Sequence, residues 1–212
     1  MITAKHYGTL DKAFDYFNAH LFEGGLPDTI ITMNRKKRVR GYFHHDKFQN
    51  RTSHEGLSEI SLNPDEFLER DDLEILSTLV HEMTHLWQAI YGDAPRKGYH
   101  DKEFSRKMYS LGLQTSSTGE PDGKPIGQRM SHYILRAGQF EIVAKGFTLK
   151  EGKILIESLP DPEKEKKEKK KTRYKYTCPE CGMAAWAKKS ANIACGDCKE
   201  SMIIEEEDNE NG

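Results

Sequence analysis

The feature of this chain that most restricts its fold is the five-residue segment HEMTH at positions 81–85, which lies inside a long apolar stretch. Apolar residues recur there around more than one helical stripe, which predicts a buried helix from about Asp71 to Tyr91, ended by Gly92. Histidine and glutamate are costly to bury without partners. Metal binding would explain why a buried helix carries them.

The spacing within this segment favours a metal site over a chance cluster of surface polar residues. His81 and His85 stand one helical turn apart, so their imidazoles leave the same face and can share one cation. Glu82 lies about 100° further around the helix. That offset keeps its carboxylate off the metal but near water beside it, where it can accept a proton as the water attacks a carbonyl.

A catalytic zinc ion usually has three protein ligands, and two downstream residues are candidates for the third. His100 follows His85 by 15 residues and directly precedes a helix expected over residues 101–111. Glu103 follows by 18 residues, and its alternative role is a first-turn glutamate that interacts with the helix dipole. We favour His100, because a loop entering a helix can turn an imidazole toward the neighbouring helix.

Three further polar residues are weaker candidates for orienting a ligand or stabilising an oxyanion: His54, His132 and Tyr133. Each could equally be an ordinary polar residue. The strand expected at residues 57–62 precedes the metal-binding helix. An exposed edge of that strand could hold an extended peptide by strand addition.

The remaining pattern predicts an α+β domain over residues 1–159. We expect a helix over 9–21, strands at 29–33, 40–44 and 57–62, and a helix start at Asn63 with a capping box closed by Glu66. Residues 114–130 read as an irregular loop. Residues 139–158 read as a hairpin that turns near Gly152.

All four cysteines lie in two C-x-x-C pairs near the end of the sequence, Cys178 with Cys181 and Cys195 with Cys198. This pattern is typical of a zinc ribbon, which we place at residues 176–204, with iron or a redox pair as alternatives. A unit of this size has little core without a metal. Two separate ligand sets predict two zinc ions per chain, one catalytic and one structural.

Charge is unevenly distributed along the chain. Residues 160–204 contain 11 Lys/Arg and 7 Asp/Glu, and the tail at 205–212 contains five acidic residues and no basic ones. A charged linker is expected at 160–175, and a second basic cluster lies at residues 35–40. These clusters either bind nucleic acid or are merely solvated. The sequence shows no signal peptide or membrane-spanning run, so we expect a cytoplasmic protein.

Several of these motifs together resemble the SprT-like zinc metallopeptidases, the Spartan-related family. The resemblance covers about residues 9–110 and rests on the FN…LF…LP pattern of residues 17–27, the segment EISLNP at 59–64, the motif at 81–85 and the segment GYHDKEF at 98–104. It implies a zincin-like fold, with His81, His85 and His100 as zinc ligands and Glu82 as the base. Tyr99 and Asp101 depart from the family's usual sequence around the third ligand.

The sequence therefore predicts a zinc-dependent endopeptidase with an appended zinc ribbon, and the resemblance implies that it cleaves proteins bound or crosslinked to DNA. The rival hypothesis is a non-catalytic zinc scaffold that binds nucleic acid or protein through the ribbon. The glutamate at position 82 argues against the rival, because a purely structural site needs no base.

Overall fold

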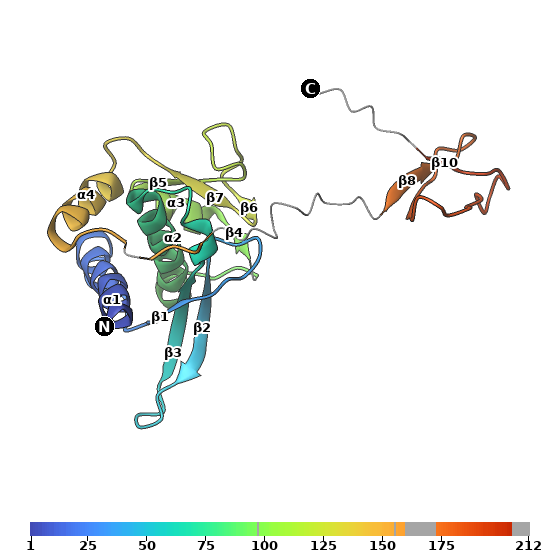
Figure 1. Ribbon diagram of the computed structural model, residues 1–212. Helices are drawn as coiled ribbons and strands as arrows, with labels where there is room; N and C mark the ends of the chain where they lie inside the picture. Colours follow the sequence, from blue (N-terminus) through green and yellow to red (C-terminus); the bar gives the residue numbers. More distant parts are fainter. Residues whose placement is uncertain (97, 155, 160–172, 205–212) are drawn as a thin grey trace. The chain divides into compact units, whose positions relative to one another are not determined.

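The computed structural model describes residues 1–96, 98–154, 156–159 and 173–204, and it divides into two compact units, Met1–Pro160 and Asp161–Gly212 (Figure 1). Most of the linker expected at 160–175 and the whole acidic tail at 205–212 lie outside the described residues. Among the helices that the structure describes, none has the length and apolar character needed to cross a membrane.

The first unit is a mixed α+β domain arranged around one central helix. Its described helices are α1 (Ile2–Leu21), α2 (Asp72–Tyr91), α3 (Lys102–Ser110) and α4 (Gln139–Glu151). Twelve residues of α2 are buried, as its apolar pattern predicted. The first helix begins seven residues earlier than expected, and its additional turns bury His6.

The expected limits of the central helix are confirmed by its capping interactions. The side chain of Asp71 accepts a hydrogen bond from the backbone N–H of Glu74, and the Glu74 carboxylate accepts one from the backbone N–H of Asp71 at 3.0 Å. These reciprocal bonds satisfy two of the donors left open at a helix start. Gly92 follows the last residue of the helix, as predicted.

A three-stranded sheet packs against this helix, and its strand order is β1–β3–β2. Strand β1 (Ile30–Met33) pairs parallel with β3 (Gly56–Leu62), and β2 (Gly41–Gln49) pairs antiparallel with β3. The expectation of an exposed edge on the strand at 57–62 is therefore wrong. That strand is the central one, with partners on both sides, and β2 is the outer strand beside α2.

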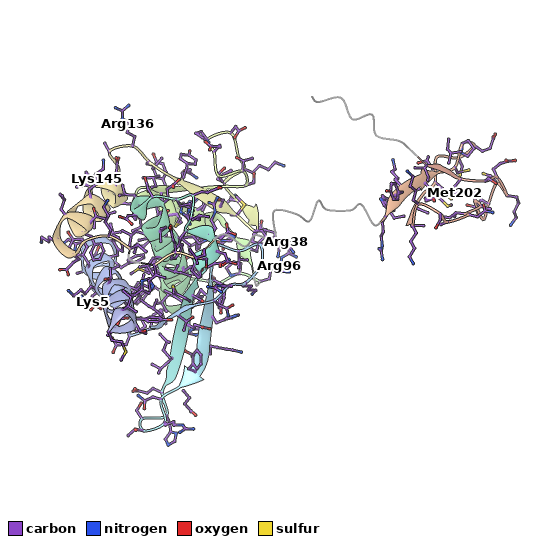
Figure 2. The ribbon with its side chains drawn as sticks, in the orientation of Figure 1. Lys5, Arg38, Arg96, Arg136, Lys145 and Met202 are labelled. Carbon is purple, nitrogen blue, oxygen red and sulfur yellow. The ribbon has the colours of Figure 1, made fainter. Side chains whose placement is uncertain are left out.

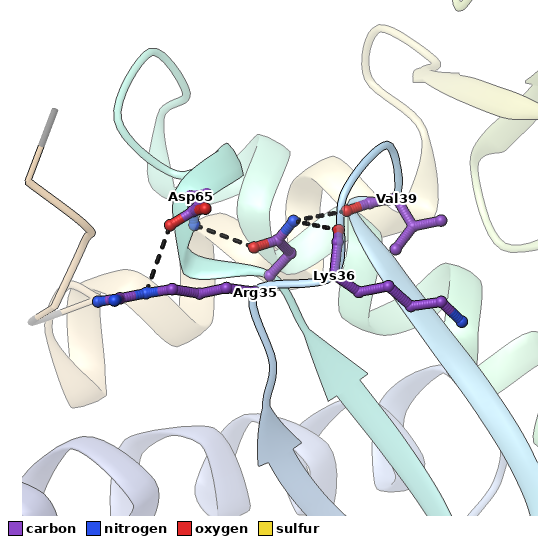
Figure 3. A network of polar contacts seen from close by, with 5 residues as sticks. Arg35, Lys36, Val39 and Asp65 are labelled. Atoms are coloured by element: carbon purple, nitrogen blue, oxygen red, sulfur yellow. Dashed lines mark hydrogen bonds and ion pairs between the residues drawn. The ribbon is translucent and has the colours of Figure 1, made fainter. Parts of the chain in front are cut away.

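The segment joining β1 to β2 carries the basic cluster of residues 35–40, and hydrogen bonds from Asn63 hold it in place. The Asn63 amide donates to the carbonyls of Lys36 at 3.0 Å and Val39 at 2.8 Å, and Arg35 pairs with Asp65 at 3.4 Å (Figure 3). Asn63 also accepts from the backbone N–H of Asp65, but only a single 3₁₀ turn, Pro64–Glu66, follows it. The predicted capping box at this point is thus wrong, and the true one lies at Asp71.

Two short ladders complete the sheet structure of the first unit. Strand β4 (Tyr99–His100) pairs with β6 (Gly127–Gln128), and β5 (Leu113–Ser116) pairs with β7 (Ser131–Ile134). The stretch 114–130 is therefore irregular only between the strands at its ends. Its polar composition concealed the residues that pair.

The predicted hairpin at 139–158 is wrong, because residues 139–151 form helix α4. Its buried residues Phe140, Ala144 and Phe147 follow helical spacing. Two of them contact the aromatic residues of α1, with Phe17 lying 5.8 Å from Phe140 and 5.9 Å from Phe147 between ring centroids. Packing against α1 thus decides the conformation of a segment whose Phe, Val, Ile and Thr content also suits a strand.

The second unit contains a small antiparallel sheet in the order β10–β8–β9. Its strands are β8 (Tyr174–Thr177), β9 (Ala184–Ala187) and β10 (Ile203–Ile204). Its buried cluster is only four residues: Tyr176, Cys178, Cys195 and Met202. The Tyr176 hydroxyl lies 2.9 Å from the carbonyl oxygens of both Lys188 and Lys189, and its single proton is shared between them. A core this small depends on its cysteines for stability.

Candidate metal sites

Three imidazoles converge in the first unit, and their Nε2 atoms face one another. The Nε2 atom of His100 lies 3.0 Å from Nε2 of His81 and 3.1 Å from Nε2 of His85. Ligand atoms of a tetrahedral zinc ion, held at about 2.0–2.1 Å from the metal, stand about 3.3 Å apart. The donor type and the spacing of these three nitrogens therefore fit a zinc ion.

The fold brings His100 to the helix through hydrogen bonds on both sides of it. His100 belongs to β4, which pairs with β6. The next residue, Asp101, caps α3 by accepting from the Phe104 backbone N–H at 2.9 Å. The same carboxylate oxygen accepts from Gln88 Nε2 at 3.0 Å, and Gln88 is buried on α2. Asp101 thus ties the His100 loop to the helix that carries His81 and His85.

The alternative third ligand, Glu103, is engaged elsewhere. Its carboxylate accepts from Gln88 Nε2 at 2.8 Å and from the Asp93 backbone N–H at 3.0 Å. It therefore holds the segment that leaves the end of α2. The structure groups His81, His85 and His100 without it.

Burial keeps these imidazoles neutral, which is the form that ligates a metal. It lowers the pKa of His85 to about 3 and that of His100 to about 4, and it places the pKa of His81 well below its ordinary value. Only 6% of His81 and 5% of His100 are exposed. Three neutral, desolvated imidazoles with facing nitrogens form a cation site.

Glu82 follows His81 on α2, and the backbone of Gly41 passes close to its carboxylate. Burial raises the pKa of its carboxyl to about 8, whereas a cation at the three nitrogens would favour the carboxylate. Strand β2 begins here with Gly41. A Cβ atom at that position would stand 3.0 Å from Glu82 Oε1 and 3.1 Å from Thr78 Cγ2. Only glycine allows the strand to pass this close to the carboxylate.

Of the three weaker candidates, only His132 is placed at the site. Its Nδ1 lies 3.1 Å from His81 Nδ1, and its Nε2 lies 2.8 Å from the Ser77 hydroxyl. His54 is exposed between β2 and β3, and Tyr133 is paired with Gln114 in the β5–β7 ladder. Within the described residues, neither His54 nor Tyr133 makes a ring contact or a hydrogen bond with the three histidines.

Two arginines flank His132. Arg40 donates to the hydroxyl of Ser131 at 3.0 Å, and Arg70 donates to the hydroxyl of Thr78 at 3.0 Å. Burial, followed by the charges of Arg70 and Arg40, lowers the pKa of His132 to about 3. The sequence placed Arg40 only in the basic cluster at residues 35–40, and it did not single out Arg70 or Ser77. Ser77 had one available signal, because it stands one turn before His81 on the same helical face.

The four cysteines of the second unit form a separate cluster. Cys181 Sγ and Cys195 Sγ are 3.7 Å apart and all four thiols are free, which excludes a disulfide between this pair. Thiolates held at about 2.3 Å from a tetrahedral zinc ion stand about 3.8 Å apart. The backbone N–H groups of Cys198 and Asp197 lower the pKa of Cys195 to about 7, which favours the thiolate that a metal requires.

Fold and site together define an α+β domain in which His81 and His85 of the central helix and His100 of β4 form a candidate metal site, followed by a unit with a four-cysteine cluster. The chain belongs to the SprT-like family, whose model matches residues 10–122. It is also 40% identical over 58 residues to an uncharacterized protein in the mucB 3' region of Salmonella typhimurium. That match covers 27% of this chain and 78% of the relative.

Proposed function

We propose that this protein is a zinc-dependent endopeptidase with its active centre at His81, Glu82, His85 and His100. The observation that carries the proposal is the convergence of three Nε2 atoms at zinc-like spacing, two of them from buried histidines, next to the buried residue Glu82. A structural zinc site is normally closed by a fourth protein ligand. Here three protein ligands are grouped, which leaves a coordination position for water or substrate.

The residues have distinct roles in this proposal. Zinc supplies Lewis acidity toward water and the scissile carbonyl. Glu82 accepts the proton of the attacking water, since its position on α2 turns it away from the converging nitrogens but keeps it adjacent to them. The imidazoles of His81, His85 and His100, in their neutral form, hold the ion. The family to which the chain belongs supports this assignment.

Strand β2 is the element best placed to hold a substrate. It lies at the outside of the sheet, it starts at Gly41 beside Glu82, and the Phe43 ring stacks at 9° on the ring of His85. An extended peptide added to this strand would run past the metal and be held through main-chain hydrogen bonds. Such binding tolerates many sequences, which suits an endopeptidase of broad specificity.

The test of this function is zinc-dependent cleavage of an unstructured protein such as casein. Zinc removal with a chelator should abolish cleavage, and added zinc should restore it. Elemental analysis of the intact protein should find two zinc ions per chain. The matched control is Cys178→Ser, which should lose one ion and keep its cleavage activity, because the two sites share no ligand. Cleavage that persists after both ions are removed would contradict the proposal.

We further propose that its substrates are proteins bound to DNA, in a reducing compartment such as the cytoplasm, where thiols persist to hold zinc. Basic side chains project from several elements of the first unit, among them Arg38 and Arg96 (Figure 2). In the second unit 62% of Trp186 is exposed, next to the Lys188–Lys189 pair. An exposed aromatic residue among lysines suits stacking on unpaired bases.

Removing residues 160–212 should weaken DNA binding but leave the peptidase unit intact. Among the described residues, the hydrophobic core of the first unit extends no further than Ile154, so the 1–159 fragment should fold and keep one zinc ion. The logarithm of the DNA-binding constant of the full chain should decrease linearly with the logarithm of the salt concentration. The slope should be about −0.9 per neutralised phosphate on duplex DNA and about −0.7 on single strands. The fragment should show a shallower slope in the same titration. Equal slopes would assign the second unit to protein recognition instead.

A further inference from the structure

The hydrogen bonds around His132 form a directed chain that ends at a zinc ligand. The Ser77 hydroxyl donates to the carbonyl of Glu74, one turn earlier in the same helix, at 2.7 Å. A hydroxyl has one proton to donate. At the 2.8 Å contact between Ser77 and His132, the donor must therefore be the Nε2–H group of His132, with the Ser77 oxygen as acceptor.

This first assignment determines the next one. With its proton on Nε2, neutral His132 has only a lone pair on Nδ1. That nitrogen lies 3.1 Å from Nδ1 of His81, and the ring centroids are 5.0 Å apart, so the two nitrogens lie between the rings and point toward each other. The proton between them must belong to His81. Its remaining nitrogen, Nε2, is then a bare lone pair, and it is this atom that faces His100 and His85.

We propose that Ser77 and His132 are positioning residues that fix His81 as the tautomer with its proton on Nδ1, so that Nε2 is available to the metal. This inference rests on the zinc site of the proposed function, not on the hydrolytic step. The opposite tautomer of His132 would donate its Nδ1–H group to Nδ1 of His81. The proton of neutral His81 would then sit on Nε2, where it would compete with the metal. Because the acceptor is a neutral imidazole and not a carboxylate, it orients His81 without adding negative charge to the site.

The geometry of the surrounding helix supports a dedicated role for this pair. Ser77, His81 and His85 lie at successive turns of α2, so the acceptor of the chain and two metal ligands share one stripe. Ser77 is 2% exposed and His132 is 9% exposed. Removing His132 would therefore leave the Nδ1–H group of His81 buried and without its acceptor, and removing Ser77 would do the same to the Nε2–H group of His132.

The experiment measures the zinc affinity of the histidine site by chelator competition, with the ribbon zinc of the same chain as internal reference. His132→Leu should weaken zinc at the histidine site by about 10- to 100-fold. His132→Asn, whose amide carries both a donor and an acceptor, should recover part of that loss. Ser77→Ala should weaken zinc several-fold, whereas Ser77→Thr should not. The ribbon zinc should be unaffected throughout.

The matched control for Ser77 is Thr84→Val, which removes another buried hydroxyl from the same helix. Thr84 donates to the carbonyl of Val80 at 2.9 Å and contacts none of the histidines through that group. It should leave zinc affinity unchanged. Nitrogen NMR of the zinc-loaded protein adds a direct readout, because it distinguishes a protonated Nδ1 from a protonated Nε2. We expect His81 to carry its proton on Nδ1 and His132 on Nε2.

The outcomes separate this inference from the proposed function. Equal zinc affinity in wild type, His132→Leu and Ser77→Ala, or a His81 proton on Nε2, would overturn the inference and leave the zinc peptidase standing. Should His132→Leu fail to fold, Ser77→Ala and His132→Asn decide the matter by the same measurements. Absence of zinc at the histidine site of the wild type would overturn both. Normal zinc effects without any peptidase activity would overturn only the proposed function.

Discussion

Replacing Glu82 with glutamine should reduce peptide hydrolysis by about 10³-fold while leaving both zinc ions in place. The amide has the size of the carboxylate but cannot accept the proton of the attacking water, and general-base catalysis contributes about 10²- to 10⁴-fold. Glu82 is not among the three residues whose ligand atoms converge, so zinc content should remain two per chain. The measurement is kcat/KM on an unstructured substrate, with elemental analysis of the same sample.

The control for this variant is another buried glutamate, Glu59. It is 8% exposed on strand β3, and it accepts from the hydroxyl of Thr32 at 2.7 Å. Glu59→Gln changes the charge of a buried carboxyl group away from the histidines and should keep full activity. If Glu82→Gln were as active as Glu59→Gln, Glu82 would not be the base. Absence of cleavage by the wild type itself would make the non-catalytic scaffold the better hypothesis.

Replacing His100 with alanine should remove the zinc ion of the first unit and abolish activity. Two imidazoles on one helix hold zinc far less tightly than three imidazoles do. The group of possible ligands at this site contains only His81, His85 and His100, so no other member can replace His100. Elemental analysis should find one zinc ion per chain, in the ribbon. Activity should fall to the level of the chelated protein.

Glu103→Ala provides the matched comparison, and it should affect stability instead of zinc. Losing its carboxylate leaves the amide of Gln88 and the backbone N–H of Asp93 with fewer partners, at a cost of about 1–3 kcal/mol. Thermal unfolding should detect this change, and the zinc count should remain two. Loss of zinc from Glu103→Ala with retention in His100→Ala would instead assign the third ligand to the glutamate.

The sequence predicts the centre of this site well because its geometry is local. Two histidines four residues apart on a helix face the same way whatever surrounds them, and capping residues limit that helix at Asp71 and Gly92. For the third ligand, the sequence favoured His100 and left Glu103 as the alternative. What separates them is the hydrogen bonding of Asp101 and Gln88, which depends on how two helices pack.

The less successful predictions concern features that depend on distant contacts. His132 approaches His81 across 51 positions of the sequence, so no spacing rule could select it over His54 or Tyr133. Helix α4 was mistaken for a hairpin because its β-branched and aromatic residues suit either conformation, and only its packing on α1 decides. The order of the sheet, with β3 at its centre, likewise follows from tertiary packing.

Two of the three proposed zinc ligands, His81 and His85, lie on the central core helix, and zinc binding there would link metal supply to folding. An ion that binds the native chain and not the unfolded one shifts the folding equilibrium by mass action, by about 1.4 kcal/mol for each tenfold rise in free zinc above the dissociation constant. The same helix supplies Leu76, Leu79, Val80 and Met83 to the core. With zinc bound as proposed, the folded population of this protein would depend in part on the free zinc concentration of its surroundings.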